Sequence, residues 1–211
     1  MLLADIQANI DTITDRPDRV NERNLAIQEA TLELHAIENW WRDEVEQPVV
    51  FSASANYQQI ALVNLPRFRT FRYIRKYDPS GVDPISQQST GAPGDFFLPR
   101  KADKILDSYG QTEDNIYYLT GGGSTANGVC QLRSTTAFQF LNISWMTFPT
   151  VSPLTSYNSW IADLYPYAII TRAALKLKKY ITDSDSAKLL AGDAQTHYQN
   201  LLVNALEFSS R

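Results

Sequence analysis

Apolar residues recur at two different spacings along the chain, and the change of spacing divides the sequence into three parts. Near both ends they repeat every three or four positions, which predicts amphipathic helices with one buried face. In the middle, short β-branched and aromatic runs predict strands. The pattern therefore predicts an α+β fold, in which N- and C-terminal helical pairs form a four-helix bundle around an inserted antiparallel β-rich region. The expected domains are residues 1–45, 46–150 and 151–211.

Four helices are expected at the two ends. The first runs from Leu3 to Ile13, and the second carries an apolar stripe that includes Leu34 and Ile37. A third expected helix spans residues 160–181. Pro166 lies six residues into it and predicts a kink or a fresh helix start. The last expected helix follows an acidic turn and covers about residues 187–208.

The middle part is expected to hold several short strands and one long loop. The loop covers residues 78–95, where Gly, Pro, Ser and Gln occur without periodicity. A short helix is expected over residues 101–109. A hairpin is expected around the glycines at 121–123. The predicted strands are residues 48–51, 59–63, 68–77, 116–119, 129–132 and 138–145.

Composition and charge narrow the class of protein. Hydrophobic residues make up 44% and charged residues 20%, which is typical of a globular chain. A net charge of −4 excludes a uniformly basic nucleic-acid binder. The N-terminal residues lack the features of a signal peptide, and no apolar run reaches membrane-spanning length. The single cysteine permits no internal disulfide, so we expect a protein folded in the cytoplasm and no membrane partner.

Residues with catalytic or metal-binding chemistry are few. His35 and His197 both fall within helical patterns, where packing or surface roles are commoner than catalysis. Cys130 lies in an expected strand and is interpreted as a small buried residue. One cysteine and two distant histidines do not make a tight metal-ligand set. We therefore expect no enzyme activity, no catalytic residue, no metal and no cofactor.

Two groups of basic residues are candidate interaction sites. Arg67, Arg69, Arg72 and Arg75 alternate with aromatic residues in an expected strand, where regular alternation would place Arg72 opposite the other three. The favoured interpretation is a charged edge strand, and the sharper one is a patch that faces DNA or an acidic partner ring. The second group was interpreted as a solvated helix face, as were three acids of the second helix. These residues are Arg172, Lys176 and Lys179, and Glu22, Glu29 and Glu33.

Two segments carry a family resemblance. Residues 16–51, RPDRVNERNLAIQEATLELHAIENWWRDEVEQPVVF, run from a proline turn through a long helix, His, aromatics and Asp into a strand. Residues 160–206 hold a Tyr-Pro, an alanine-rich helix, an acidic turn and a Tyr-bearing helix. Both resemble the head-to-tail adaptor family of tailed bacteriophages and, more distantly, the podovirus tail tubular gatekeeper proteins.

The resemblance implies a structural virion protein of the phage neck. Such a protein forms a ring, expected to be dodecameric, that docks on the portal protein and contacts tail or nozzle proteins. DNA would pass through its channel without sequence-specific binding. A ring needs more apolar and aromatic surface than a monomer, and Trp40, Trp41 and Trp160 offer that surplus. The alternatives left open are a tail tubular or stopper-type neck protein and a carbohydrate-binding module.

Overall fold

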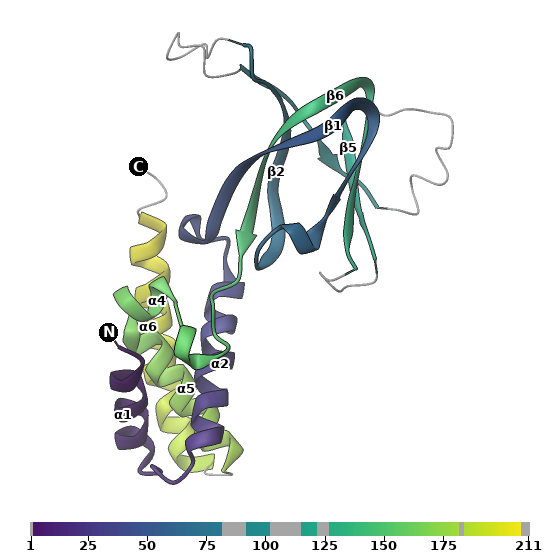
Figure 1. Ribbon diagram of the computed structural model, residues 1–211. Helices are drawn as coiled ribbons and strands as arrows, with labels where there is room; N and C mark the ends of the chain where they lie inside the picture. Colours follow the sequence, from purple (N-terminus) through teal and green to yellow (C-terminus); the bar gives the residue numbers. More distant parts are fainter. Residues whose placement is uncertain (1, 82–91, 102–114, 122–126, 182–183, 208–211) are drawn as a thin grey trace. The chain divides into compact units, whose positions relative to one another are not determined.

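The chain folds into two compact units, shown in Figure 1. The computed structural model describes residues 2–81, 92–101, 115–121, 127–181 and 184–207. The helical unit comprises residues 1–43 and 148–211, and the β unit comprises residues 44–147. Both ends of the chain therefore belong to one unit, and the other unit is inserted between them.

The described part of the helical unit contains five α-helices, so the predicted four-helix bundle is wrong. The expected helix at 160–181 is divided because Tyr165 leaves the helical conformation and Pro166 occupies the first position of the next helix. Pro166 thus starts a fresh helix, one of the two outcomes predicted for it. The five helices are α1 (Leu3–Thr14), α2 (Val20–Ile37), α4 (Trp160–Leu164), α5 (Pro166–Tyr180) and α6 (Ser184–Glu207).

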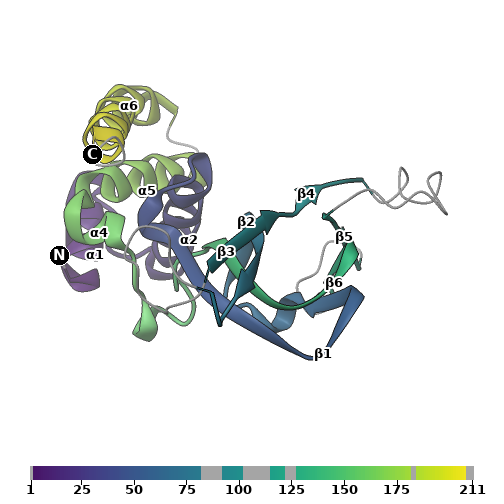
Figure 2. The ribbon, with the colours of Figure 1, turned by 90° about the horizontal axis from the view of Figure 1, so that it is seen from above.

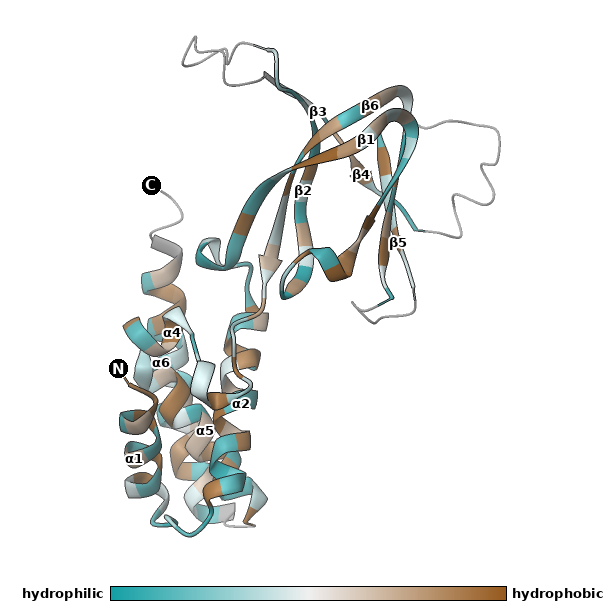
Figure 3. Cartoon of the chain, viewed as in Figure 1, coloured by the Kyte–Doolittle hydropathy of each residue, from teal (hydrophilic) through white to brown (hydrophobic). Residues whose placement is uncertain are grey.

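Helix α5 is the centre of the helical unit and packs against the other four helices. Ile169 and Ile170 are fully buried in the core that it shares with Ile27 and Leu34 of α2. Figure 3 shows hydrophobic and hydrophilic residues alternating around these helices. Ile37, placed in the middle of the predicted stripe, is 37% exposed because α2 ends at this residue. None of the described helices is long and apolar enough to cross a bilayer.

Ion pairs connect α2 to α5, so the interpretation as solvated faces is wrong for Arg172, Lys176, Glu29 and Glu33. Lys179 is exposed, and Glu22 pairs with Arg19 at the start of α2 itself. Glu33 accepts a hydrogen bond from Arg172. The Nζ atom of Lys176 lies 3.4 Å from Oε2 of Glu29 and 3.1 Å from Oε2 of Glu33. The hydrogen bond from Arg172 lowers the pKa of Glu33. Because these groups are only partly buried, each pair adds little stability, but together they fix how the two helices face each other.

The β unit holds one mixed six-stranded sheet. Strand β4 runs parallel to β5, while the other strand pairs are antiparallel, so the prediction of an antiparallel region is wrong in this detail. The predicted strands at 48–51 and 59–63 are parts of one long strand, β1. The strands are β1 (Glu44–Ala61), β2 (Phe68–Asp78), β3 (Ala92–Phe96), β4 (Leu98–Pro99), β5 (Ile116–Thr120) and β6 (Val129–Thr147).

The strand order is β3-β2-β6-β5-β4, and β1 also pairs with β6. Strand β6 is long, so β2 pairs with its C-terminal part and β5 with its N-terminal part, while β1 pairs along nearly all of its length. The two end strands of this order, β3 and β4, are joined by one residue, Phe97, whose N–H donates to the Ile74 carbonyl at 2.7 Å. The chain thus crosses from β2 to β5 and closes the path of strands, as the curled sheet in Figure 2 shows. The curled sheet encloses an apolar core that includes Leu132, Leu141 and Trp145.

The middle part also settles two predictions about loops. The hairpin around the glycines is confirmed, since β5 pairs with β6 from Ile116↔Arg133 to Thr120↔Val129, and Gly121 has a φ of 107°. The long loop at 78–95 is wrong at both ends, because Asp78 closes β2 and residues 92–96 form β3. The short helix expected at 101–109 lies outside the described residues, apart from its first residue.

Candidate functional site

The three tryptophans proposed for interaction meet in one pocket of the helical unit. Trp40 and Trp41 follow α2, and Trp160 begins α4. The pocket has a volume of about 260 Å³, and Leu164, Tyr165, Ala205 and Arg42 complete its wall. We call this the tryptophan pocket. Residues from three segments that are far apart in the sequence thus form one concave, mainly apolar surface.

The pocket wall is held by aromatic contacts. Trp40 is 3% exposed and donates its indole N–H to the carbonyl of Leu34, which lies in the last turn of α2. Trp160 packs edge-on against Trp40 at 5.7 Å and against Tyr165 at 6.4 Å. Trp41, in contrast, is 46% exposed. One tryptophan therefore supports the pocket from the core, and another presents its ring to solvent.

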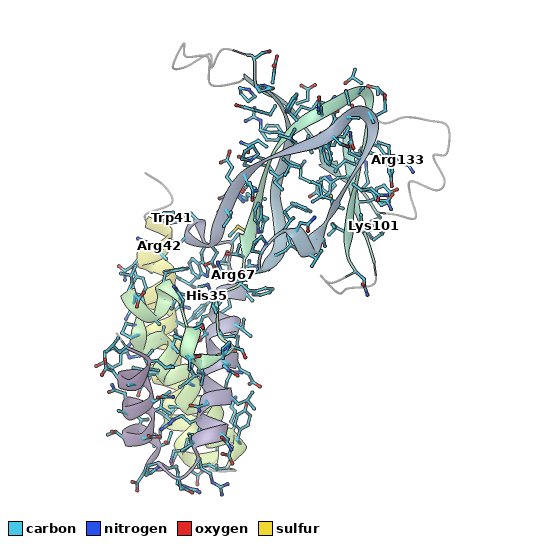
Figure 4. The ribbon with its side chains drawn as sticks, viewed as in Figure 1. His35, Trp41, Arg42, Arg67, Lys101 and Arg133 are labelled. Carbon is cyan, nitrogen blue, oxygen red and sulfur yellow. The ribbon has the colours of Figure 1, made fainter. Side chains whose placement is uncertain are left out.

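Arg42 gives the pocket one positive charge that the sequence analysis did not single out. Its guanidinium lies 4.5 Å from the ring centroid of Trp41 and 5.9 Å from that of Trp160. Figure 4 shows Trp41 and Arg42 side by side. An arginine that packs on an aromatic ring keeps its N–H donors free, because they lie in the plane of the guanidinium and point away from the ring face. An approaching acceptor can reach them there. The pocket can thus receive an apolar group next to a negatively charged or carbonyl oxygen.

A buried polar network lies under the pocket. The Nδ1 atom of His35 is 2.8 Å from Oδ2 of Asp43, and its Nε2 atom is 2.9 Å from Oγ of Ser159. Trp160 donates its indole N–H to Oδ1 of Asp43 at 2.8 Å. The network joins α2, the segment after it and the start of α4. Sequence reasoning missed it, because Ser159 is 124 residues from His35 and no local pattern connects them.

Asp43, His35 and Ser159 are hydrogen-bonded in the same succession as the acid, base and nucleophile of a catalytic triad. Here, however, these groups stabilise the fold. The three residues are between 1% and 5% exposed, and neither His35 nor Ser159 lines the tryptophan pocket. The Ser159 hydroxyl also accepts the N–H of Ala162 as the N-cap of α4. A nucleophile needs space for its substrate above the hydroxyl, and this serine is enclosed. The network therefore fixes the position of Trp160.

The arginine cluster occupies the irregular part of strand β2. The register shifts between Phe68 and Thr70, and again between Phe71 and Tyr73, so Arg69 and Arg72 lie at bulges in the pairing of β2 with β6. The expected alternation of sides is therefore wrong. Phe68, Phe71 and Ile74 point into the core at intervals of three.

The two ends of the cluster have different surroundings. The guanidinium of Arg75 lies 4.7 Å from the ring centroid of Phe96. Arg67, labelled in Figure 4, precedes β2 with a φ of 53°. The structure thus does not gather Arg67, Arg69, Arg72 and Arg75 into a single basic patch.

The remaining candidates have local packing roles. His197 stacks on Tyr167 with ring centroids 5.7 Å apart. Cys130 is fully buried in the β unit, and burial raises the pKa of its thiol to about 12. Among the described residues, no three His, Cys, Asp or Glu side chains form a group that could hold a metal ion.

Comparison of the sequence with models of protein families and with curated proteins gave no match.

Proposed function

We propose that this protein is a structural subunit of a phage neck, which associates head-to-tail with copies of itself into a ring between the portal and the tail. The adaptor resemblance of residues 16–51 and 160–206 supports the place in the virion. The structural support is that the helical unit exposes two different apolar surfaces. A ring requires two different surfaces on each subunit, since a single self-complementary surface gives only a dimer.

The first surface is the tryptophan pocket, where Trp41 and Leu164 are 46% and 51% exposed. The second is the outer face of α6, where Leu189 is 80% exposed between Asp185 and Asp193, one helical turn away on either side. Leu189 precedes Ala205 of the pocket wall by 16 positions, or about 24 Å along the helix. The two surfaces are therefore separate, one concave and one protruding.

Gly192 adds a specific observation on the same face of α6. Glycine in the middle of a helix costs about 0.5–1 kcal/mol relative to alanine. A Cβ atom built at Gly192 would meet no atom of this chain within 4 Å, so nothing in the described subunit requires the glycine. Its absent side chain allows a neighbouring chain to approach the helix closely. This face of α6 thus carries both an exposed leucine and room for a partner.

The experiment is electron microscopy of the protein co-expressed with the portal protein of the same virus. We expect a closed ring of this chain on the portal, with its subunits in contact through the helical units. The matched variant is Leu189→Asp, which should leave the subunit folded but prevent ring closure. A wild-type protein that stays monomeric and leaves the portal bare would overturn the proposal.

A further inference from the structure

An arginine in the β unit is held between two tyrosine rings, and its Nε atom has no hydrogen-bond partner among the residues that the structure describes. Arg133 of β6 lies directly opposite Tyr57 of β1, and Tyr118 of β5 pairs with Gln131, two residues before Arg133. Side chains two residues apart on a strand share a face, so these groups project from the same side of the sheet. The guanidinium carbon lies 5.7 Å from the ring centroid of each tyrosine. We call this arrangement the arginine clasp; Figure 4 labels Arg133.

The clasp is preorganised by Gln131. Both tyrosine hydroxyls donate to its Oε1 atom, Tyr57 at 2.8 Å and Tyr118 through a shorter contact. Its Nε2 atom donates to the Thr120 hydroxyl at 3.3 Å. The hydroxyl groups are therefore occupied, and the rings are fixed on either side of the guanidinium.

The guanidinium itself is left with unmet hydrogen-bond donors. The Nε atom of Arg133 is buried and has no acceptor, and no carboxylate or carbonyl is bonded to the guanidinium among the described residues. An arginine side chain has five N–H donors and is always charged, so a half-buried guanidinium without an acceptor is costly. In the same unit, Lys76 satisfies its ammonium group with the hydroxyls of Ser134 and Thr136, at 2.8 and 2.5 Å. The clasp thus presents a cation whose hydrogen-bond donors are not used by the described side chains.

The space beside the clasp fits a small anionic group. A pocket of about 420 Å³ opens there, lined by Asn56, Tyr57, Arg133, Ser134 and Thr135. The lining offers one cation and neutral polar groups, which suits a planar monoanion bound through the guanidinium fork better than a doubly charged phosphate. A carboxylate has this charge and this shape.

We propose that the arginine clasp binds a side-chain carboxylate of a neighbouring copy of this chain. The choice of a second copy rests on the proposed ring, in which copies lie side by side. Charge supports it, since the chain carries 23 acidic residues and a net charge of −4. Asp95, for example, is exposed in the same unit, next to Phe96, which is 52% exposed. Each subunit of a ring thus presents a carboxylate to one neighbour and binds a carboxylate of the other neighbour.

The first experiment tests the site without requiring a ring. The Nε–Hε NMR signal of Arg133, assigned by its loss in Arg133→Lys, is followed during titration with N-acetyl-glutamate amide. We expect a saturable shift and no shift with N-acetyl-glutamine amide. Backbone amide signals of the same strand, which both proteins share, should report binding about 10- to 100-fold weaker in Arg133→Lys, which lacks the fork. Equal responses to the two probes, or no response, would overturn the carboxylate site. Tighter binding of inorganic phosphate or glucuronate would assign the clasp to a phosphate or an acidic sugar and also overturn it.

The second experiment tests the partner. Arg133→Gln should weaken subunit association, measured by sedimentation at fixed salt, about 10- to 100-fold. Arg19→Gln, which removes a partly exposed guanidinium from the helical unit, is the matched control and should leave association unchanged. Rings that form equally well with Arg133→Gln would overturn the assignment to a second copy. A saturable NMR shift in a protein that stays monomeric would instead contradict the proposed ring and leave the carboxylate site standing.

Discussion

The two units bury different kinds of side chain. In the described part of the helical unit, four charged or titratable side chains are less than 10% exposed, namely Arg23, His35, Asp43 and Lys178. The polar side chains that are as deeply buried in the described β unit are neutral, namely Asn115, Ser134, Ser144 and Thr147. The difference reflects how each unit connects segments that are distant in sequence. Strands are joined by backbone hydrogen bonds, whereas helices satisfy their own backbone and need side chains for the purpose.

The largest effect is therefore expected from the buried network of the helical unit. Asp43→Ala removes the acceptor of both His35 and Trp160, and each buried donor left without an acceptor costs about 1–3 kcal/mol. Urea unfolding followed by circular dichroism measures the loss. The variant Asp163→Ala changes an exposed aspartate of α4 and serves as the control. A loss below that of the control would show that the network is not what joins these segments.

The apolar core of the same unit should respond next. Leu34→Ala removes a side chain that is 1% exposed and should cost about 2–5 kcal/mol in unfolding free energy. Ile37→Ala, one turn further along α2, should cost clearly less, because Ile37 is 37% exposed. The same urea titration compares the two variants. Equal losses would mean that α2 buries a wider face than the structure shows.

How far the sequence predicted the fold depends on whether the pattern is regular. The periodic helix α1 and the pairing of β5 with β6 were predicted near their observed bounds. The apolar stripe predicted for the second helix ran on to Trp41, whereas α2 ends at Ile37. Strand β1 was read as two strands, because it bends through register shifts between Val50 and Tyr57. Its Pro48 is accommodated because β6 is the only strand among the described residues that pairs with β1, so the other edge of β1 needs no N–H from Pro48.

The candidate site was predictable only in part. Aromatic surplus pointed to Trp40, Trp41 and Trp160, which the pocket brings together. The network behind them depends on contacts across 117 residues or more, between Trp160 or Ser159 and the end of α2, and only folding reveals these. Bulges in β2 likewise follow from pairing with β6 and not from the local sequence, so the sides of the arginine cluster were predicted wrongly.

In the β unit, the buried thiol predicts a specific pH dependence. Burial raises the pKa of Cys130 to about 12, above the value of about 8.5 for an unfolded chain. The stability that this shift contributes is present below about pH 8.5 and is lost as the pH rises towards 12, by at most about 1.4 kcal/mol per pH unit. Urea unfolding at pH 8 and pH 10 should show a smaller alkaline loss in Cys130→Ala than in the wild type. Equal losses would contradict the burial of the thiol.

The smallest effect on stability is expected on the outer face of α6. Gly192→Ala should stabilise the isolated subunit by about 0.5–1 kcal/mol, since the added Cβ meets nothing within the chain. The same change should weaken ring assembly, because it fills the space left for a neighbour. Thermal melting and sedimentation measure the two effects. A variant that is more stable and assembles normally would remove Gly192 from the proposed interface.

The most direct test of the proposed ring mixes two variants, each with one surface disabled. Trp41→Asp alters the tryptophan pocket, and Leu189→Asp alters the outer face of α6; both positions are exposed, so each subunit should stay folded. Each variant alone should be monomeric by native mass spectrometry, whereas a mixture should give a complex of one copy of each and nothing larger. That result follows only if the two surfaces bind each other head-to-tail. A mixture that stays monomeric while the wild type forms rings, or single variants that still form rings, would contradict the account.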